Sequence, residues 1–151
     1  MPRISGIFGA LEISASGMSA QRARIDVISS NVANVHTTRV DGGSYYKRQV
    51  IVLKESKLSL DFSSILNDEI GFGIGDQLSG VEVVEVSTIN ESAKMIYEPN
   101  HPDANEEGMV SYPNINIIEE MVNMILSSRA FEANLTVFNT AKEMISQSLE
   151  I

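Results

Sequence analysis

The sequence predicts an α+β protein in which long N- and C-terminal helices form an antiparallel, coiled-coil-like pair, with a small antiparallel β region inserted between them. Apolar residues at heptad spacing fill the last forty residues, a second apolar stripe runs through residues 5–35, and short β-branched stretches lie between the two. The expected segments are an N-terminal core helix at 1–38, a loop and β region at 39–112, and a C-terminal core helix at 113–151.

The first expected helix covers residues 5–35 and carries one apolar stripe. The stripe consists of Leu11, Ala15, Met18, Ile25, Ile28, Val32 and Val35. Gly17 and several serines lower the intrinsic helix propensity of this segment. Its many alanines keep the helix thin, so that a second helix is able to approach it closely.

Two asparagines, Asn31 and Asn34, stand at the end of this helix. Asparagine tolerates left-handed backbone geometry and bonds to nearby backbone groups, so the pair is expected to stop the helix. The alternative is that Asn31 and Asn34 form a contact motif that other subunits recognise.

The middle of the chain is expected to hold three strands. Residues 45–53 alternate in a strand-like way, and residues 80–86 and 93–97 form two further strands. Because only a short polar turn separates the last two, they are expected to pair as an antiparallel hairpin. Glycines interrupt residues 58–80, which are therefore expected to form a loop with a short strand at most.

The last helix follows an acidic loop at 98–108 and a short lead at 109–112. Pro113 stops any earlier helix, Asn116 is a suitable N-cap, and Glu119 completes a capping-box pattern. The heptad seam of this helix consists of Ile117, Met121, Met124, Ser128, Phe131, Leu135, Phe138, Lys142, Ile145 and Leu149.

The charge and composition exclude several classes of protein. The net charge of −9 argues against nucleic-acid binding, which requires clustered basic residues. Residues 1–54 hold seven bases and three acids, whereas residues 55–110 hold two bases and twelve acids, a contrast that could orient neighbouring copies. No apolar run is long enough for membrane insertion, and the N-terminus lacks the layout of a cleavable secretory signal.

No catalytic, cofactor-binding or metal-binding residues are expected. The chain has no cysteine, and His36 and His101 do not stand in ligand spacing with another histidine. Asp103, Asn105 and Glu107 match part of a calcium-binding loop, but the position that should hold a bidentate glutamate is Asn114. An enzyme is therefore disfavoured. A coiled-coil adaptor or regulatory protein that binds partner helices explains the spacing of the apolar residues equally well.

Both ends of the chain resemble the flagellar axial family, which contains the rod and hook proteins. The resemblance rests on the runs SSNVANVHT at 29–37, EEMVNMI at 119–125, SRAFEAN at 128–134 and NTAK at 139–142. Within that family the chain is most similar to the short subunits of the proximal rod. The insertion DGGSYYKRQ at 41–49, the stretch YEPNHPD at 97–103 and the absence of room for a large outer domain favour them.

This resemblance implies a structural subunit that self-assembles into the helical drive shaft of the flagellar basal body. The implied partners are copies of itself, other proximal and distal rod proteins, the junction protein between the rod base and the MS ring, and the flagellar type III export apparatus. The implied location is the periplasmic rod, after export from the cytoplasm. The seam of the last helix is expected to pack on its intrachain mate, which leaves the small-residue faces for neighbouring subunits.

Twelve residues of the two helices are expected to serve assembly and packing. They are Leu11, Met18, Ile25, Asn31, Val32, Asn34, Met121, Met124, Phe131, Asn134, Leu135 and Phe138.

Overall fold

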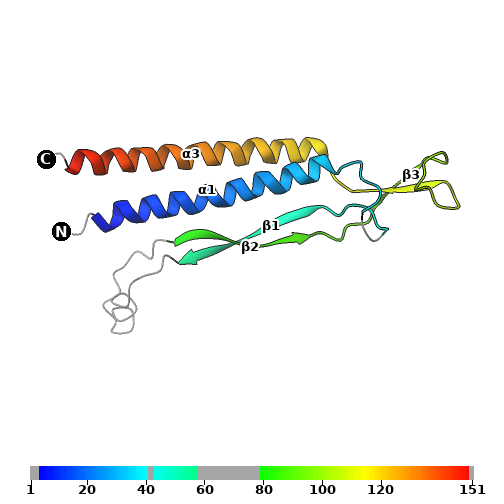
Figure 1. Ribbon diagram of the computed structural model, residues 1–151, viewed down its shortest axis with the longest axis horizontal. Helices are drawn as coiled ribbons and strands as arrows, with labels where there is room; N and C mark the ends of the chain where they lie inside the picture. Colours follow the sequence, from blue (N-terminus) through cyan, green and yellow to red (C-terminus); the bar gives the residue numbers. More distant parts are fainter. Residues whose placement is uncertain (1–3, 41–42, 58–78, 150–151) are drawn as a thin grey trace, which may run out of the picture. The chain divides into compact units, whose positions relative to one another are not determined.

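The computed structural model describes residues 4–40, 43–57 and 79–149. Along the chain, these residues form a long helix, then four strands, then a second long helix (Figure 1). The elements are α1 (Ile4–Ala33), β1 (Gln49–Lys57), β2 (Ser79–Thr88), β3 (Lys94–Tyr97), β4 (Met109–Tyr112) and α3 (Ile117–Leu149). This architecture confirms the predicted α+β class, with a helix toward each end of the chain and a small β region between them.

The chain forms two compact units, and both units contain parts of both helices. Unit 1 consists of Met1–Gln21, Leu53–Val84 and Arg129–Ile151, and unit 2 consists of Arg22–Val52 and Glu85–Ser128. Within each unit the segments of α1 and α3 run side by side in opposite directions (Figure 1). Each unit thus contains parts of all three segments that the sequence predicts.

The start of α3 is set by local chemistry. The side-chain oxygen of Asn116 accepts the backbone N–H of Ile118 at 3.1 Å, and the Asn116 carbonyl accepts the N–H of Glu120 at 3.0 Å. Asn116 is therefore the predicted N-cap, which supplies a partner to a helix donor that otherwise has none. Glu119, the expected second half of a capping box, has its carboxylate 3.8 Å from the guanidinium of Arg48.

The end of α1 confirms the position of the predicted stop and the expected bond from asparagine to a nearby backbone group, but not the left-handed geometry. Asn34 donates both its backbone N–H, at 3.1 Å, and its side-chain Nδ2, at 2.9 Å, to the carbonyl of Ser30. No described residue other than glycine has a positive φ, so the helix does not end through a left-handed asparagine. Asn31 lies inside the last turn of α1, with its side chain buried.

The strand pairing differs from the expected hairpin. β2 pairs with β1, and β3 pairs with β4, so the expected pairing of residues 80–86 with 93–97 is wrong. In the β3–β4 sheet, Lys94 lies opposite Tyr112 and Tyr97 lies opposite Met109. Residues 109–112, expected to be a simple lead into the last helix, are therefore strand β4. The short turn after β2 does not return the chain on itself because both strands find partners elsewhere in the sequence.

The connection between β3 and β4 depends on a glycine that no other residue replaces without strain. Gly108 has a φ of +75°, and a Cβ atom at this position would lie 2.9 Å from the ring of Tyr97 and 3.3 Å from Cβ of Pro99. The N–H of Gly108 bonds to the carbonyl of Asn105 at 2.9 Å, while the Gly108 carbonyl accepts the N–H of Glu98. These local bonds close the acidic loop into a hairpin.

The first strand also begins later than expected. β1 starts at Gln49 rather than at residue 45, because Tyr45 and Tyr46 belong to the preceding connection, in which the N–H of Tyr46 bonds to the carbonyl of Thr37. Most of the expected glycine-rich loop at 58–80 lies outside the described residues. Its last two residues, Ser79 and Gly80, begin β2.

The contact between the helices corrects the expected seam. Within the described residues the buried apolar side chains are few: Ala20, Val27, Ile28, Val110 and Ala141. The inner face of α3 carries small and polar side chains at seven-residue spacing, namely Glu120, Ser127, Asn134 and Ala141. On the α3 side, the contact with α1 is thus made by small and polar residues. Met121 and Leu135 of the expected seam are 54% and 41% exposed.

Candidate functional site: a buried polar cluster and an exposed apolar strip

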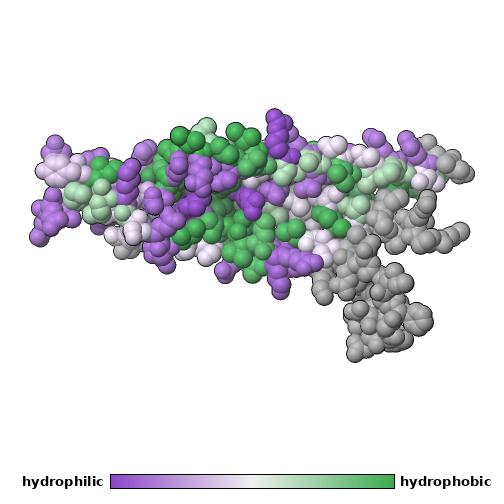
Figure 2. Space-filling view, turned by 180° about the vertical axis from the view of Figure 1, so that it is seen from behind, coloured by the Kyte–Doolittle hydropathy of each residue, from purple (hydrophilic) through white to green (hydrophobic). Residues whose placement is uncertain are grey.

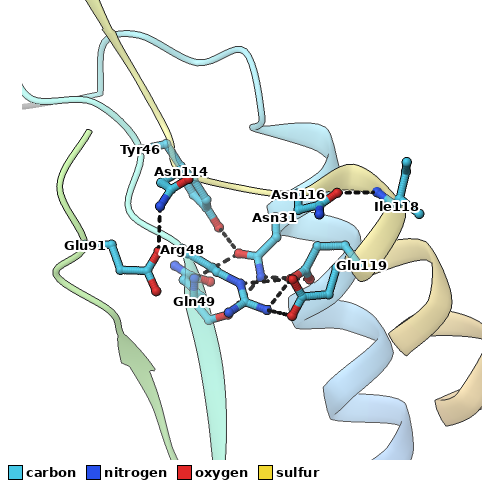
Figure 3. A network of polar contacts seen from close by, with 10 residues as sticks. Asn31, Tyr46, Arg48, Gln49, Glu91, Asn114, Asn116, Ile118 and Glu119 are labelled. Atoms are coloured by element: carbon cyan, nitrogen blue, oxygen red, sulfur yellow. Dashed lines mark hydrogen bonds and ion pairs between the residues drawn. The ribbon is translucent and has the colours of Figure 1, made fainter. Parts of the chain in front are cut away.

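The centre of unit 2 is the side-chain amide of Asn31, which is 1% exposed (Figure 3). Its Nδ2 donates to the carbonyl of Gln49 at 2.8 Å and to Oε2 of Glu120 at 3.3 Å. Its Oδ1 accepts the backbone N–H of Gln49 at 2.9 Å and the hydroxyl of Tyr46 at 3.1 Å. Both donors and both acceptor sites of the amide are therefore used. Toward Gln49, the amide acts as a peptide group of a neighbouring strand would.

An ion pair completes this polar cluster. Arg48 donates to Oε1 of Glu120 through Nε at 2.9 Å and through Nη2 at 2.5 Å, and Glu120 is 1% exposed. A buried carboxylate is tolerated only when it is paired and hydrogen-bonded, and here both of its oxygens have partners. The polar cluster (Asn31, Tyr46, Arg48, Gln49 and Glu120) joins the last turn of α1, the start of β1 and the first turn of α3.

Further polar contacts hold the connections around the polar cluster. The hydroxyl oxygens of Ser30 and Tyr46 lie 3.2 Å apart. Asn114 donates to the Glu91 carboxylate at 3.1 Å (Figure 3). The Tyr45 hydroxyl donates to the carbonyl of Glu91 at 2.9 Å. The segment before β1 and the segment after β2 are thereby tied to the residues that precede α3.

The outer face of α3 in unit 2 carries an apolar strip. The α3 strip consists of Ile118, Met121, Val122, Ile125 and Leu126, each at least half exposed and up to 74% exposed at Ile118. The spacing of three, one, three and one places the five side chains on one face of the helix. Hydrophobic surface is exposed on the molecule in Figure 2. Contiguous apolar side chains on the outside of a protein mark a surface that binds another protein.

The predicted assembly residues fall into three groups. Asn31 is buried in the polar cluster, and Met121 and Leu135 are exposed. The other nine are half-buried: Leu11, Met18, Ile25, Val32, Asn34, Met124, Phe131, Asn134 and Phe138. The structure therefore brings Asn31 together with Glu120, and Asn134 with Gly17, but it does not bring the twelve into a single seam.

Sequence reasoning missed most of the polar cluster and of the α3 strip. The sequence context of Glu120 indicates only a favourable interaction with the helix dipole, and that of Arg48 only a place in a basic patch. Val122 and Ile125 lie outside the heptad seam, and apolar residues at such positions are a signal of a second apolar face on the helix. Nothing in the sequence alone pairs Asn31 with residue 120.

The residues of the acidic loop that match a calcium-binding pattern make hydrogen bonds within the loop and to the connection after α1. Asp103 accepts a hydrogen bond from the Thr38 hydroxyl at 2.8 Å, and Asn105 Oδ1 accepts the backbone N–H groups of Glu107 and Met109. In the part of the chain that the structure describes, no group of three or more potential ligands is arranged to hold a metal ion. Among the same residues, neither helix combines the length and hydropathy required to cross a bilayer.

Comparison with known proteins identifies the family. Residues 11–39 match the flagella basal body rod protein family, and residues 106–151 match the C-terminal family of the flagellar basal body rod FlgEFG proteins. The chain is 41% identical to the flagellar basal-body rod protein FlgC of Bacillus subtilis, over 95% of this chain and 97% of that protein. It is 40% identical to FlgC of Borreliella burgdorferi, over 97% of both chains, and 32% identical to FlgC of Salmonella typhimurium, over 93% of both. The chain therefore belongs to the flagellar basal-body rod protein family, alongside the FlgC proteins, and is a structural rod subunit.

Proposed function

We propose that this subunit occupies the proximal part of the rod and that the α3 strip is the surface through which it packs against neighbouring subunits. The observation that carries the proposal is the exposure of five large apolar side chains on one face of α3. The inner face of α3 already contacts α1 through small and polar residues. The α3 strip therefore has no partner among the described residues of its own chain.

The energetics favour burial of the α3 strip in an assembly. Full burial of one exposed Ile, Leu or Met side chain contributes about 1.5–3 kcal/mol. Five side chains that are half to three-quarters exposed therefore hold on the order of 5 kcal/mol of unused burial per subunit, before the costs of association. A weak contact of this size becomes strong when it repeats along a shaft, because each subunit then takes part in several contacts.

The contact that suits a rod is heterologous, which means that the α3 strip of one subunit meets a different surface of the next. Repetition of such a contact without closure gives a helical filament. The implied neighbours are copies of this chain, other proximal and distal rod proteins, and the junction protein at the rod base. The family resemblance supports delivery through the flagellar type III export apparatus and assembly in the periplasm. The half-buried helix residues, including Phe131 and Phe138, are proposed to complete the packing between subunits.

Substitution within the α3 strip tests the proposal. Ile125→Asp is expected to abolish swimming and to leave basal bodies without a complete rod, because a charge in a subunit interface must be desolvated. Ile125→Met, which keeps the apolar character, is the matched control and is expected to swim. Ser128→Asp adds the same charge on an exposed residue outside the α3 strip and is expected to have a smaller effect. Normal rods in the Ile125→Asp strain would contradict the proposal.

A further inference from the structure

We propose that Asn31 is a register-setting residue, whose side-chain amide selects the residue of β1 and the turn of α3 that lock onto the end of α1. The proposal goes beyond subunit assembly, because it concerns which of several similar alignments the chain adopts within unit 2. Its consequence for the rod, a single presentation of the α3 strip, rests on the proposed function.

The helix contact by itself does not define one alignment. The inner face of α3 repeats small or polar residues every seven positions, so a shift by one heptad again places a small or polar side chain against α1. In unit 2 such a shift would put Ser127 in the place of Glu120. Asn31 would then lose its carboxylate partner, and Arg48 would lose both of its short contacts with Glu120. The polar cluster thus penalises the shifted alignment, whereas the small-residue contact does not.

The same amide also fixes the alignment of β1. Asn31 donates to the carbonyl of Gln49 and accepts its N–H, so it pairs with one residue of the strand and with no other. Successive residues of a strand direct their backbone groups to opposite sides, so a slip by one residue would turn the groups of Val50 away from Asn31. Only an amide side chain offers a donor and an acceptor in this arrangement.

The burial of Asn31 decides between the two interpretations of the asparagine pair, a helix stop or a contact motif that other subunits recognise. A side chain that is 1% exposed and fully hydrogen-bonded is not available for recognition by a neighbouring subunit. Asn34 is only half-buried, and its Nδ2 and Oδ1 contact Ser30 in the last turns of α1 and Thr37 in the connection that follows. The two asparagines therefore have different roles, and Asn31 acts across elements that lie 18 and 89 residues away in the sequence.

A distance measurement in the purified full-length chain tests the alignment directly. The chain has no cysteine, so Ser29→Cys and Ser128→Cys, both exposed and both in unit 2, take spin labels at defined sites. The parent is expected to give one narrow distance distribution. Asn31→Leu is expected to add a second population, because a shift of seven residues moves α3 along α1 by roughly 10 Å. One narrow distribution at the parental distance in Asn31→Leu would overturn the proposal.

Exchange of donor and acceptor provides a second measurement that does not depend on a folded Asn31→Leu variant. Asn31→Asp places two carboxylates in contact, and Glu120→Gln weakens the pair with Arg48, so each alone is expected to broaden the distribution. The double variant restores a donor and an acceptor between positions 31 and 120, but it does not restore the hydrogen bond from position 31 to the Gln49 carbonyl. It is therefore expected to give a distribution narrower than that of Asn31→Asp and broader than that of the parent. Asn34→Asp is the matched control and is expected to keep the parental distribution.

A double variant as broad as Asn31→Asp alone would show that the 31–120 contact does not set the alignment, and it would overturn the proposal. These outcomes are distinct from a failure of the proposed function. If unit 2 changes alignment in Asn31→Leu while Ile125→Asp still builds rods, the register role stands and the α3 strip is not the interface.

Discussion

Gly17 of α1 lies so close to α3 that a Cβ atom on it would be 2.8 Å from Nδ2 of Asn134. Glycine within a helix costs about 1 kcal/mol relative to alanine, so a residue with a side chain would favour the helix itself. The close approach in unit 1 means that a methyl group at residue 17 would displace the end of the Asn134 side chain.

A pair of substitutions separates the two effects at Gly17. Gly17→Ala is expected to raise the free energy of unfolding by less than the full propensity difference of about 1 kcal/mol, because the new methyl group displaces the end of the Asn134 side chain. The same substitution in an Asn134→Ala background is expected to gain the full difference. Ser19→Ala, at an exposed position of the same helix, is the control. Equal gains from Gly17→Ala in the two backgrounds would show that residue 17 does not approach Asn134 so closely.

Two glycines with the same backbone geometry test the role of the β3–β4 connection. Gly43 and Gly108 have φ values of +79° and +75°, but only Gly108 has neighbours within 4 Å of the added Cβ. Gly43→Ala is expected to cost about 1–2 kcal/mol through backbone strain. Gly108→Ala is expected to cost more, because the methyl group also meets Tyr97 and Pro99. Denaturant unfolding measures both, and equal losses would contradict the contact with Tyr97.

The hydroxyl of Tyr112 predicts a dependence of stability on alkaline pH. It donates to the Glu98 carboxylate at 3.0 Å, and this hydrogen bond, together with partial desolvation and the charge of Glu98, raises the pKa of Tyr112 above its ordinary value of 10.0. Because the folded state favours the protonated phenol, the stabilisation is present below pH 10 and is lost as the pH rises through the raised pKa. Tyr112→Phe is expected to lack this loss of stability at alkaline pH. Spectrophotometric titration of tyrosinate in the parent, compared with the variant, measures the pKa of Tyr112. A Tyr112 that ionises at or below pH 10 would contradict the contact.

The half-buried Phe131 predicts a defect in assembly that leaves export intact. Phe131→Asp is expected to abolish swimming, because it places a charge at a half-buried position of α3, while the secreted amount of the subunit stays near that of the parent. Ala133→Asp puts the same charge at an exposed neighbouring position and is expected to have a smaller effect. Normal motility of the Phe131→Asp strain would remove Phe131 from the proposed assembly residues.

The elements that were predicted correctly are those that local chemistry determines. Asn116 caps α3 with its own side chain, and α1 ends within two residues of the expected position because Asn34 bonds to the preceding turn. Both effects operate within a few residues of sequence. The two long helices were predictable for a related reason, since apolar residues that recur at helical spacing over about thirty residues strongly favour a helix.

The elements that were predicted wrongly depend on contacts between distant residues. A short turn after β2 favoured a hairpin with β3, but β1 and β4 are the partners that the fold supplies. Periodicity identified an apolar face of α3 without identifying its partner. In the structure the face of α3 that contacts α1 is instead the small and polar one, which includes Glu120. The polar cluster was invisible for the same reason, because Asn31 and Glu120 are 89 residues apart.

The most direct test of the account is the accessibility of the α3 strip before and after assembly. Ile125→Cys supplies the only thiol of the chain, and its rate of modification by a water-soluble maleimide is measured in the purified subunit and in isolated basal bodies that swim-competent cells have built. Rapid modification in the free subunit and strong protection in the rod are expected. Equal modification in both would show that the exposed face of α3 is not where rod subunits meet.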